Sequence, residues 1–368
     1  MQIGVPRETA AGERRVALVP DGVKRLAVKH QVLVEGGAGA AAGIPDAAYE
    51  AAGGTLTDAA TALGAELVLK VQRPSDAEVG GLREGGALVA QLAPHANEPL
   101  LAALARRRVT AFAMELVPRT TKAQAMDVLS SQATLSGYKA VLLGAEALGR
   151  VLPMLTTAAG TLSPARVLVV GAGVAGLQAI ATARRLGAVV TGFDVRPAAR
   201  EQVLSLGATF LESEAVGQGA EGAGGYAREL ADDEQQRVRD TLTRGLATAD
   251  LVVTSAQVPG KPAPRLITAA MVAAMKPGAV IVDLAAEGGG NCELTRAGET
   301  VAAGGVTILG PVNLAASVPA HASQMYSRNV QSFVEYAVQE AGLAGADDPI
   351  AGPMCVTLAG EVRYRRPQ

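Results

Sequence analysis

Short apolar runs alternate with longer amphipathic stretches along nearly the whole chain. Toward the N-terminus, apolar runs rich in Val, Leu and Ala predict strands at Gln2–Val5, Val32–Glu35, Leu67–Val71, Ala87–Leu92 and Val109–Met114. Between the first two of these runs, Val23 and Leu26 share one helical face, while Lys24 and Arg25 point away from it. This alternation of strand and helix patterns favours a parallel sheet with helices on both faces.

A second series of strand and helix patterns follows a long helical stretch. That stretch runs from Ser130 to about Leu155, and a turn-rich connection is predicted at Thr156–Pro164. The next predicted strands are Arg166–Val170, Val189–Phe193, Ala208–Leu211, Leu251–Ser255, Ala279–Leu284 and Val306–Leu309. A further helix is predicted around Gln324–Ala341, and a last strand at Cys355–Leu358.

The two series predict two α/β domains, which agrees with a length of 368 residues. We expect residues 1–128 together with 315–368 to form an N-terminal domain, and residues 129–314 to form the second domain. The long helix joins them, the C-terminal helix returns to the first domain, and a ligand cleft is expected between the two.

Composition excludes several classes of function. The 33 Lys and Arg residues balance 35 Asp and Glu residues, so nothing favours nucleic-acid binding. The two Cys residues and three His residues lie in no metal-ligand spacing, and no metal site is expected. The first ten residues lack the apolar segment of a signal peptide, and no apolar run is long enough to span a membrane. We therefore expect a soluble chain in a reducing compartment.

The sharpest motif is a strand, a glycine-rich turn and a helix at residues 166–186. Gly171, Gly173 and Gly176 have the G-x-G-x-x-G spacing. The first glycine permits the tight turn, the second admits a pyrophosphate close to the backbone, and the third lets the helix approach the strand. The complete strand–turn–helix–strand context predicts a Rossmann-like dinucleotide site.

An acidic residue ends the second strand of this unit. Asp194 follows Gly176 by 18 residues, close to the spacing of a carboxylate that binds the adenosine ribose. Such a carboxylate favours NAD over NADP because it repels a 2′-phosphate. Arg196 weakens this preference, since an arginine at this place can bind a 2′-phosphate.

Two further loops are open to more than one interpretation. Val216–Tyr226 is rich in glycine, and it is either a mobile loop near the ligand or an ordinary solvent loop. In the segment after Met114–Leu116, Arg119 and Asp127 could pair and leave Gln124 free to bind a ligand. The alternative is an ordinary loop that caps the following helix.

At these residues the chain closely resembles the NAD(H)-binding subunits (domain I, alpha-1) of proton-translocating NAD(P) transhydrogenases, which are relatives of alanine dehydrogenase. The resemblance covers essentially the whole chain. It rests on the glycine loop and on the segments Arg14–Pro20, Leu69–Pro74, Ala113–Arg119, Met126–Gln132, Pro259–Pro264 and Val282–Asn291.

The resemblance implies a catalytic set at the nicotinamide end of NAD(H), formed by Arg119, Gln124 and Asp127. The implied cofactor-binding residues are Arg119, Thr120, Thr121, Gln124, Ser130, Gly171, Gly173, Val174, Gly176, Asp194, Val195, Arg196, Gly225, Tyr226 and Gln257. Gly225 and Tyr226 would belong to a mobile loop that closes on the nucleotide. Many relatives have Leu where this chain has Gln257, so an apolar contact to NAD is in doubt there.

Alanine dehydrogenase is the alternative function. The chain resembles that enzyme at Arg15 and Lys70, and Glu287 stands where that enzyme has an acidic residue. However, the catalytic His of alanine dehydrogenase is replaced within Gln91–Pro94, and His95 is displaced from its place. A purely regulatory NAD-binding module is a further alternative, which the polar loop at Gln124 disfavours.

The resemblance also implies partners and a location. It implies a homodimer that presents NADH to NADP⁺ on a separate NADP(H)-binding subunit, while a membrane-spanning subunit couples hydride transfer to proton translocation. The implied location is cytoplasmic, peripheral on the inner membrane through these partners. Hydride transfer between two nicotinamides needs proximity and orientation rather than a general acid.

Overall fold

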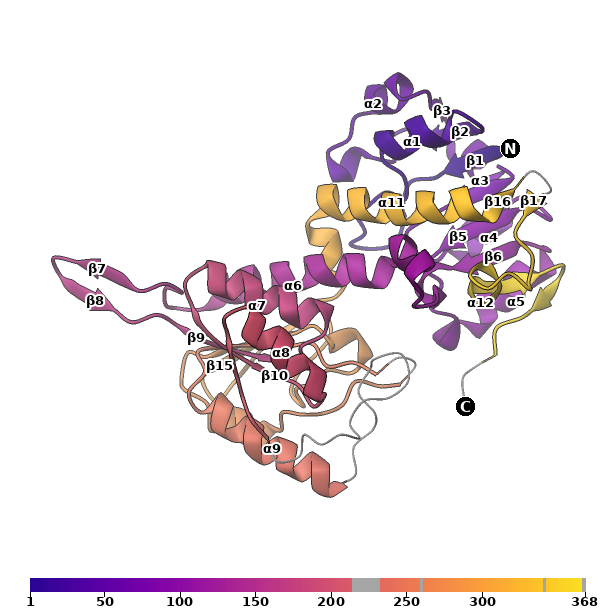
Figure 1. Ribbon diagram of the computed structural model, residues 1–368. Helices are drawn as coiled ribbons and strands as arrows, with labels where there is room; N and C mark the ends of the chain where they lie inside the picture. The colour runs from indigo at the N-terminus through magenta and orange to yellow at the C-terminus, as the bar shows by residue number, and fades with distance from the viewer. Residues whose placement is uncertain (214–231, 259–260, 340–341, 366–368) are drawn as a thin grey trace. The chain divides into compact units, whose positions relative to one another are not determined.

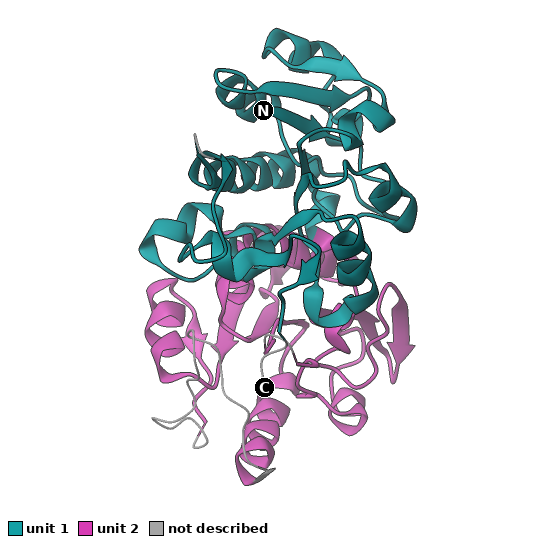
Figure 2. Ribbon diagram, turned by 90° about the vertical axis from the view of Figure 1, so that its right-hand side faces the viewer, with its two compact units in different colours: residues 1–132, 315–368 teal, residues 133–314 magenta. Residues whose placement is uncertain are grey.

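The computed structural model describes residues 1–213, 232–258, 261–339 and 342–365. Two compact units divide the chain: residues 1–132 with 315–368 form unit 1, and residues 133–314 form unit 2 (Figure 2). The first boundary falls inside the helix α6 (Val128–Ala147), and the second falls inside the short 3₁₀ helix η7 (Leu314–Ser317). The sequence-based boundary after residue 128 lies at the start of α6.

Unit 1 contains an eight-stranded sheet in the order β19-β18-β6-β5-β4-β1-β2-β3. Its strands are β1 (Gln2–Val5), β2 (Gln31–Glu35), β3 (Thr55–Thr57), β4 (Leu67–Leu69), β5 (Ala87–Ala90), β6 (Thr110–Ala113), β18 (Cys355–Leu358) and β19 (Glu361–Val362). β1 to β6 are parallel, whereas β18 and β19 add antiparallel strands at one edge. The C-terminal segment therefore completes the sheet that the N-terminus begins.

Helices cover both faces of this sheet, and the strands are buried accordingly. The helices are α1 (Pro20–Leu26), α2 (Asp46–Ala51), α3 (Ala59–Leu63), α4 (Asp76–Gly81), α5 (Glu98–Arg106), α11 (Pro319–Ala337) and α12 (Ala351–Met354), with 3₁₀ turns η1 (Ala40–Ala42), η2 (Pro94–Ala96), η3 (Met114–Leu116) and η4 (Thr121–Met126). Along β2, Val32 and Val34 belong to the core that contains Phe333 of α11, and Leu33 belongs to the core that contains Leu104 of α5. Successive residues of the strand therefore pack alternately into two hydrophobic cores, one on each face of the sheet.

Unit 2 contains a seven-stranded sheet in the order β11-β10-β9-β12-β13-β15-β14. Its strands are β9 (Arg166–Val170), β10 (Val189–Phe193), β11 (Thr209–Phe210), β12 (Leu251–Thr254), β13 (Val280–Asp283), β14 (Thr300–Ala303) and β15 (Val306–Leu309). Only β14 runs antiparallel to its neighbour. Unit 2 also contains most of α6. Its other helices are α7 (Val174–Arg185), α8 (Pro197–Ser205), α9 (Asp232–Leu246), α10 (Ala269–Ala273) and the 3₁₀ turn η6 (Ala286–Gly288).

The strand β9 explains why the runs in unit 2 are continuously apolar. Val167 and Val169 lie in a core with Ile180 of α7, while Leu168 lies in a second core with Leu242 of α9. Because both faces of the strand are covered, its residues after the exposed Arg166 are all apolar. The predicted α/β fold with two mostly parallel sheets is confirmed.

The sequence-based elements differ from the structure in several places. Predicted strand ends differ from the observed ends by at most two residues. The short edge strands β3, β14 and β19 were missed, as were β16 (Val338–Gln339) and β17 (Gly342–Leu343). The long helix ends at Ala147, and Pro153 excludes a helix that reaches Leu155. The predicted connection Thr156–Pro164 instead contributes to a hairpin of β7 (Leu155–Thr157) and β8 (Gly160–Leu162), which extends from the body of unit 2 in Figure 1. α11 begins at Pro319, earlier than predicted, because proline is favoured in a first helical turn.

Candidate functional site

The carboxyl edge of the unit 2 sheet has the topology of a nucleotide site. β10 lies on one side of β9 and β12 lies on its other side, so the connections after β9 and β12 leave in opposite directions. A crevice forms at such a switch point, and ligands of open α/β sheets bind there. The glycine-rich turn follows β9 at this point.

The three glycines of the turn meet different constraints. Gly171 has φ +93°, and a Cβ there would lie 2.9 Å from Ala256 N. A Cβ on Gly176 would lie 1.7 Å from the Gly171 carbonyl oxygen, so only glycine lets α7 approach β9 so closely. A Cβ on Gly173 would meet nothing within 4 Å. The protein's own packing therefore demands two of the glycines, while Gly173 borders open space.

Gly173 is also the N-cap of α7, and no side chain caps this helix. The N–H groups of the first turn are thus available to a ligand, and the positive end of the helix dipole favours an anion. Val174, the first residue of α7, is 43% exposed beside them. Open space over Gly173 and an uncapped helix N-terminus fit the pyrophosphate of a dinucleotide.

Asp194 follows β10 and lies against the glycine turn. Its Oδ2 accepts a hydrogen bond from Ala172 N at 2.7 Å and pairs with Arg196 Nη2 at 2.9 Å. Its Oδ1 accepts hydrogen bonds from the backbone N and the Nε of Arg196, both at 2.9 Å. A carboxylate offers about four acceptor positions. A ribose hydroxyl that binds Asp194 therefore competes with the bonds from Arg196, whose side chain is 20% exposed.

The remaining predicted residues of unit 2 are less enclosed. Val195 is partly buried against the core beneath β10. Gln257 is exposed, and its Nε2 donates a 3.4 Å hydrogen bond to the Leu284 carbonyl oxygen. Glu287 is exposed in η6. Gly225 and Tyr226, with the rest of the predicted loop Val216–Tyr226, lie outside the described residues.

Sequence reasoning missed two residues that support the glycine turn. Ser255 follows β12, and its Oγ donates a hydrogen bond to the Gly171 carbonyl oxygen at 3.0 Å. Asn291 is completely buried and hydrogen-bonds the backbone of Ala256. Asn291 belongs to a segment that carries the family resemblance, but its position along the chain gives no sign of this contact.

The second predicted group lies in unit 1, on the 3₁₀ helix η4. A 3₁₀ helix has three residues per turn, so residues three apart share a face. Ala123 and Met126 are buried on one face, whereas Thr121 and Gln124 are exposed on another. Buried anchors thus hold η4 against the core and leave the Gln124 amide in solvent; Arg119 and Thr120, which precede η4, are exposed as well.

Asp127 does not pair with Arg119 in the structure. Its carboxylate accepts hydrogen bonds from Ser130 N at 2.9 Å and from Ser130 Oγ at 2.6 Å, so it caps α6. Asn329 of α11, another residue that sequence reasoning missed, donates to the Ala125 carbonyl oxygen at 2.7 Å. In the structure Asp127 therefore caps α6, and Asn329 holds the C-terminal part of η4 through Ala125.

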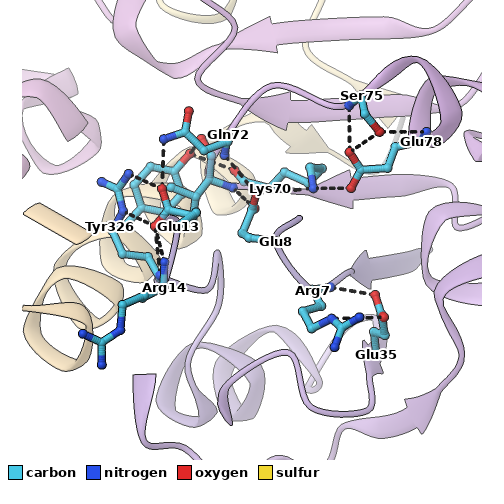
Figure 3. A network of polar contacts seen from close by, with 12 residues as sticks. Arg7, Glu8, Glu13, Arg14, Glu35, Lys70, Gln72, Ser75, Glu78 and Tyr326 are labelled. Atoms are coloured by element: carbon cyan, nitrogen blue, oxygen red, sulfur yellow. Dashed lines mark hydrogen bonds and ion pairs between the residues drawn. The ribbon is translucent and has the colours of Figure 1, made fainter. Parts of the chain in front are cut away.

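Unit 1 also buries a network of charged side chains near the start of the chain (Figure 3). Arg15 donates from Nε and Nη2 to the two carboxylate oxygens of Glu13, at 2.8 and 2.6 Å, and from Nη1 to Gln132 Oε1 at 2.9 Å. Lys70 Nζ lies 2.7 Å from Glu78 Oε1 and 3.3 Å from Glu8 Oε2. Each cation is thus neutralised by carboxylates of the same unit.

Burial and pairing act in opposite directions on these carboxyl groups. Burial is the largest influence on Glu8 and raises the pKa of its carboxyl, although the charge of Lys70 opposes this. Burial alone would also raise the pKa of Glu13. There, the hydrogen bonds and charge of Arg15 and the hydrogen bond from Gln72 outweigh burial and lower the pKa to about 2.

Unit 1 has no imidazole within Gln91–Pro94, where the resemblance places the catalytic His of alanine dehydrogenase. His95 is exposed in η2. Gln91 follows β5 and Glu115 lies just beyond β6; within the described residues, Gln91 Nε2 and Glu115 Oε2 are buried without hydrogen-bond partners. Burial raises the pKa of Glu115 despite hydrogen bonds from the backbone of Ala93 and Leu92. Among the described residues, no cluster of three possible metal ligands occurs, and no helix could cross a membrane.

Comparison with known proteins identifies both halves of the chain. Residues 4–136 match the family model "Alanine dehydrogenase/PNT, N-terminal domain", and residues 140–365 match "Alanine dehydrogenase/PNT, C-terminal domain". The two matches together cover most of the chain.

Transhydrogenase subunits and alanine dehydrogenases are both similar to this chain over nearly their full lengths. An NAD(P) transhydrogenase subunit alpha chain of Rhodospirillum rubrum is 47% identical over 98% of this chain and 97% of that protein. Alanine dehydrogenase of Halomonas elongata is 33% identical over 99% of this chain and 95% of that protein. The crystal structure of transhydrogenase from Sinorhizobium meliloti has a TM-score of 0.90 at 45% identity, covering 98% of this chain and 100% of that one. A structure of L-alanine dehydrogenase has a TM-score of 0.83 at 27% identity, covering 99% and 97%.

The paired Glu13 carboxylate makes stability depend on acid pH. The pKa of Glu13 is lowered in the folded state, so its contribution is present above the unfolded pKa of about 4.5 and is lost as the pH falls toward 2. We expect Glu13→Gln to reduce the free energy of unfolding at pH 7 by roughly 2–3 kcal/mol. The deficit should shrink as the pH falls from about 4.5 to about 2. Urea unfolding of both proteins across this range measures it, and a deficit that does not change with pH would contradict the pairing.

Proposed function

Because the chain belongs to the alanine dehydrogenase/PNT family, we propose that it is the NAD(H)-binding subunit of a proton-translocating NAD(P) transhydrogenase. It binds NADH and presents it for hydride transfer to NADP⁺ on a partner subunit, in a Re/Si-specific reaction that is coupled to proton translocation. NAD(H) supplies the hydride, and the protein supplies position and orientation.

One observation carries the choice between the two activities of the family. Reductive amination of an oxo acid needs an acid–base group beside a cationic anchor. In unit 1 the cations Arg15 and Lys70 are paired with carboxylates, and the His95 side chain is exposed. Transfer between two nicotinamides needs no such group. The greater similarity to the transhydrogenase subunit supports the same choice.

The residues of unit 2 bind the pyrophosphate and the adenosine end. In the proposal, Gly171, Gly173, Gly176 and Val174 surround the pyrophosphate, and Asp194, Val195 and Arg196 hold the adenosine ribose. The open space over Gly173 and the uncapped start of α7 support the first assignment. The place of Asp194 at the end of β10 supports the second. Gln257, Gly225 and Tyr226 complete the proposed contacts.

The residues of η4 and its flanks orient the nicotinamide end. Gln124 has an exposed amide on a helix turn whose other face is anchored in the core, so it can bind a ligand without unfolding the loop. Arg119, Thr120 and Thr121 lie on the same segment. Asp127 and Ser130 act through the cap that joins this segment to α6.

The proposed partners are an NADP(H)-binding subunit, a membrane-spanning subunit and a second copy of this chain. The hairpin β7–β8 supports the homodimer. Met154, Leu155 and Leu162 are 64%, 42% and 55% exposed on or beside it, and an isolated two-stranded hairpin is only marginally stable in water. A second copy would cover these apolar side chains. The subunit is held at the cytoplasmic face of the inner membrane through its partners.

A direct assay separates the two activities. We expect the purified chain to bind NADH, detected by nucleotide fluorescence, and to leave NADH unoxidised when pyruvate and ammonium are added. NADH oxidation is followed by loss of reduced-nicotinamide absorbance. Rapid turnover with pyruvate and ammonium would identify an alanine dehydrogenase and overturn the proposal.

The proposed ribose contact can be tested at Asp194. Asp194→Ala removes a charged acceptor, so we expect NADH binding to weaken by about 1–3 kcal/mol in a fluorescence titration. Asp233→Ala is the matched control, because Asp233 is an exposed carboxylate of unit 2 that pairs with Arg237 on α9. An unchanged affinity in Asp194→Ala would remove this residue from the site.

The proposed positioning of the nicotinamide can be tested at Gln124. Gln124→Asn shortens the side chain and moves its amide, so we expect hydride transfer with the NADP(H)-binding partner to slow by up to roughly a hundredfold. NADH affinity should change much less. Lys122→Gln, an exposed neighbour on η4, serves as the control. Equal losses of rate and affinity in Gln124→Asn would contradict a role in orientation.

A further inference from the structure

The segment after β12 forms one wall of the glycine turn. Ser255 Oγ binds the Gly171 carbonyl oxygen, and Ala256 N lies so near that a Cβ on Gly171 would be 2.9 Å from it. In a doubly wound sheet the adenosine half of a dinucleotide lies beside the second strand, here β10, and the other half lies across the switch point. The segment Ser255–Gln257 therefore borders the nicotinamide half.

Ser255–Gln257 lies beyond the end of β12, and the Asn291 side chain makes the hydrogen bonds to its backbone that a neighbouring strand would make within the sheet. Asn291 Oδ1 accepts a hydrogen bond from Ala256 N at 2.9 Å, and its Nδ2 donates to the Ala256 carbonyl oxygen at 2.9 Å. The same Nδ2 donates its second hydrogen to the Pro264 carbonyl oxygen at 2.9 Å. Both amide hydrogens are used, and both backbone groups of Ala256 are satisfied.

Asn291 is itself held in place from several directions. Its side chain is completely buried. Its backbone N donates to Asp283 Oδ2 at 2.8 Å, and its carbonyl oxygen accepts bonds from Leu266 N and Ile267 N at 2.9 and 3.0 Å. The amide therefore cannot follow Ala256 if that segment moves, and it limits where the segment can lie.

We propose that Asn291 is a positioning residue for the dinucleotide, which sets the distance between the Ser255–Gln257 wall and the glycine turn. It acts through Ala256 and does not itself touch the nucleotide. The inference rests on the proposed binding of NAD(H) and adds a residue to that site. Because the wall borders the half of the site beyond β10, Asn291 governs binding of the whole dinucleotide and leaves binding of its adenosine half unchanged.

Two variants and two ligands test this proposal. Asn291→Asp keeps the acceptor for Ala256 N but loses both donated bonds, and Asn291→Ala loses all three. We expect NADH affinity, measured by fluorescence, to fall roughly tenfold in Asn291→Asp and further in Asn291→Ala. AMP affinity, measured by calorimetry, should stay within about twofold of the original.

Thr295→Val is the matched control. Thr295 donates a 2.7 Å bond to Asp283, so its loss weakens the same buried network without touching Ala256. The control should lower the thermal midpoint and leave the ratio of NADH affinity to AMP affinity unchanged. NADH affinity unchanged in the Asn291 variants would overturn the proposal, and so would an equal loss of NADH and AMP affinity in both. Failure of the unsubstituted chain to bind NADH would instead overturn the proposed function.

Discussion

The buried carboxylate of Asp283 organises the nucleotide edge of unit 2. It has no exposed surface, and its two oxygens accept five hydrogen bonds, from Thr254 Oγ1, Ala285 N, Asn291 N, Cys292 N and Thr295 Oγ1. A buried charge is tolerated only when such donors replace its lost hydration. Because these donors come from β12 and from the loop after β13, satisfying one carboxylate fixes the place of both. Through its bond to Asn291 N, the carboxylate also positions the amide that holds Ala256 beside the glycine turn.

Unit 1 also buries charged side chains, but there cations and carboxylates are buried together. Its buried cations, Arg15 and Lys70, are compensated by carboxylates that belong to the chain. A substrate carboxylate would have to displace one of these partners, and breaking a buried ion pair is costly. The network therefore contributes mainly to the packing of unit 1. Gln124 on η4, to which we assign the orientation of the nicotinamide, is exposed and lies outside this buried network.

The Asp194 carboxylate accepts two kinds of hydrogen bond, one from the buried backbone and others from the Arg196 guanidinium. The bond between Ala172 N and Asp194 joins the glycine turn to the end of β10, and both groups are buried. The bonds from the Arg196 guanidinium to the same carboxylate lie nearer to solvent. In the proposed site, a ribose hydroxyl would replace one of these bonds from the guanidinium.

Local patterns in the sequence were sufficient to predict the α/β fold, the strands β9, β10 and β15, and the glycine turn with Asp194. Apolar runs, glycine stereochemistry and the length of a βαβ unit are properties of neighbouring residues. Contacts between distant segments had no such signature. Asn291 meets Ala256 across 35 residues, and Asn329 meets Ala125 across 204. Which buried backbone group each amide satisfies is decided only when the sheet and its loops are packed together, because hydrogen bonding depends on the final distance and direction between atoms and not on the order of residues.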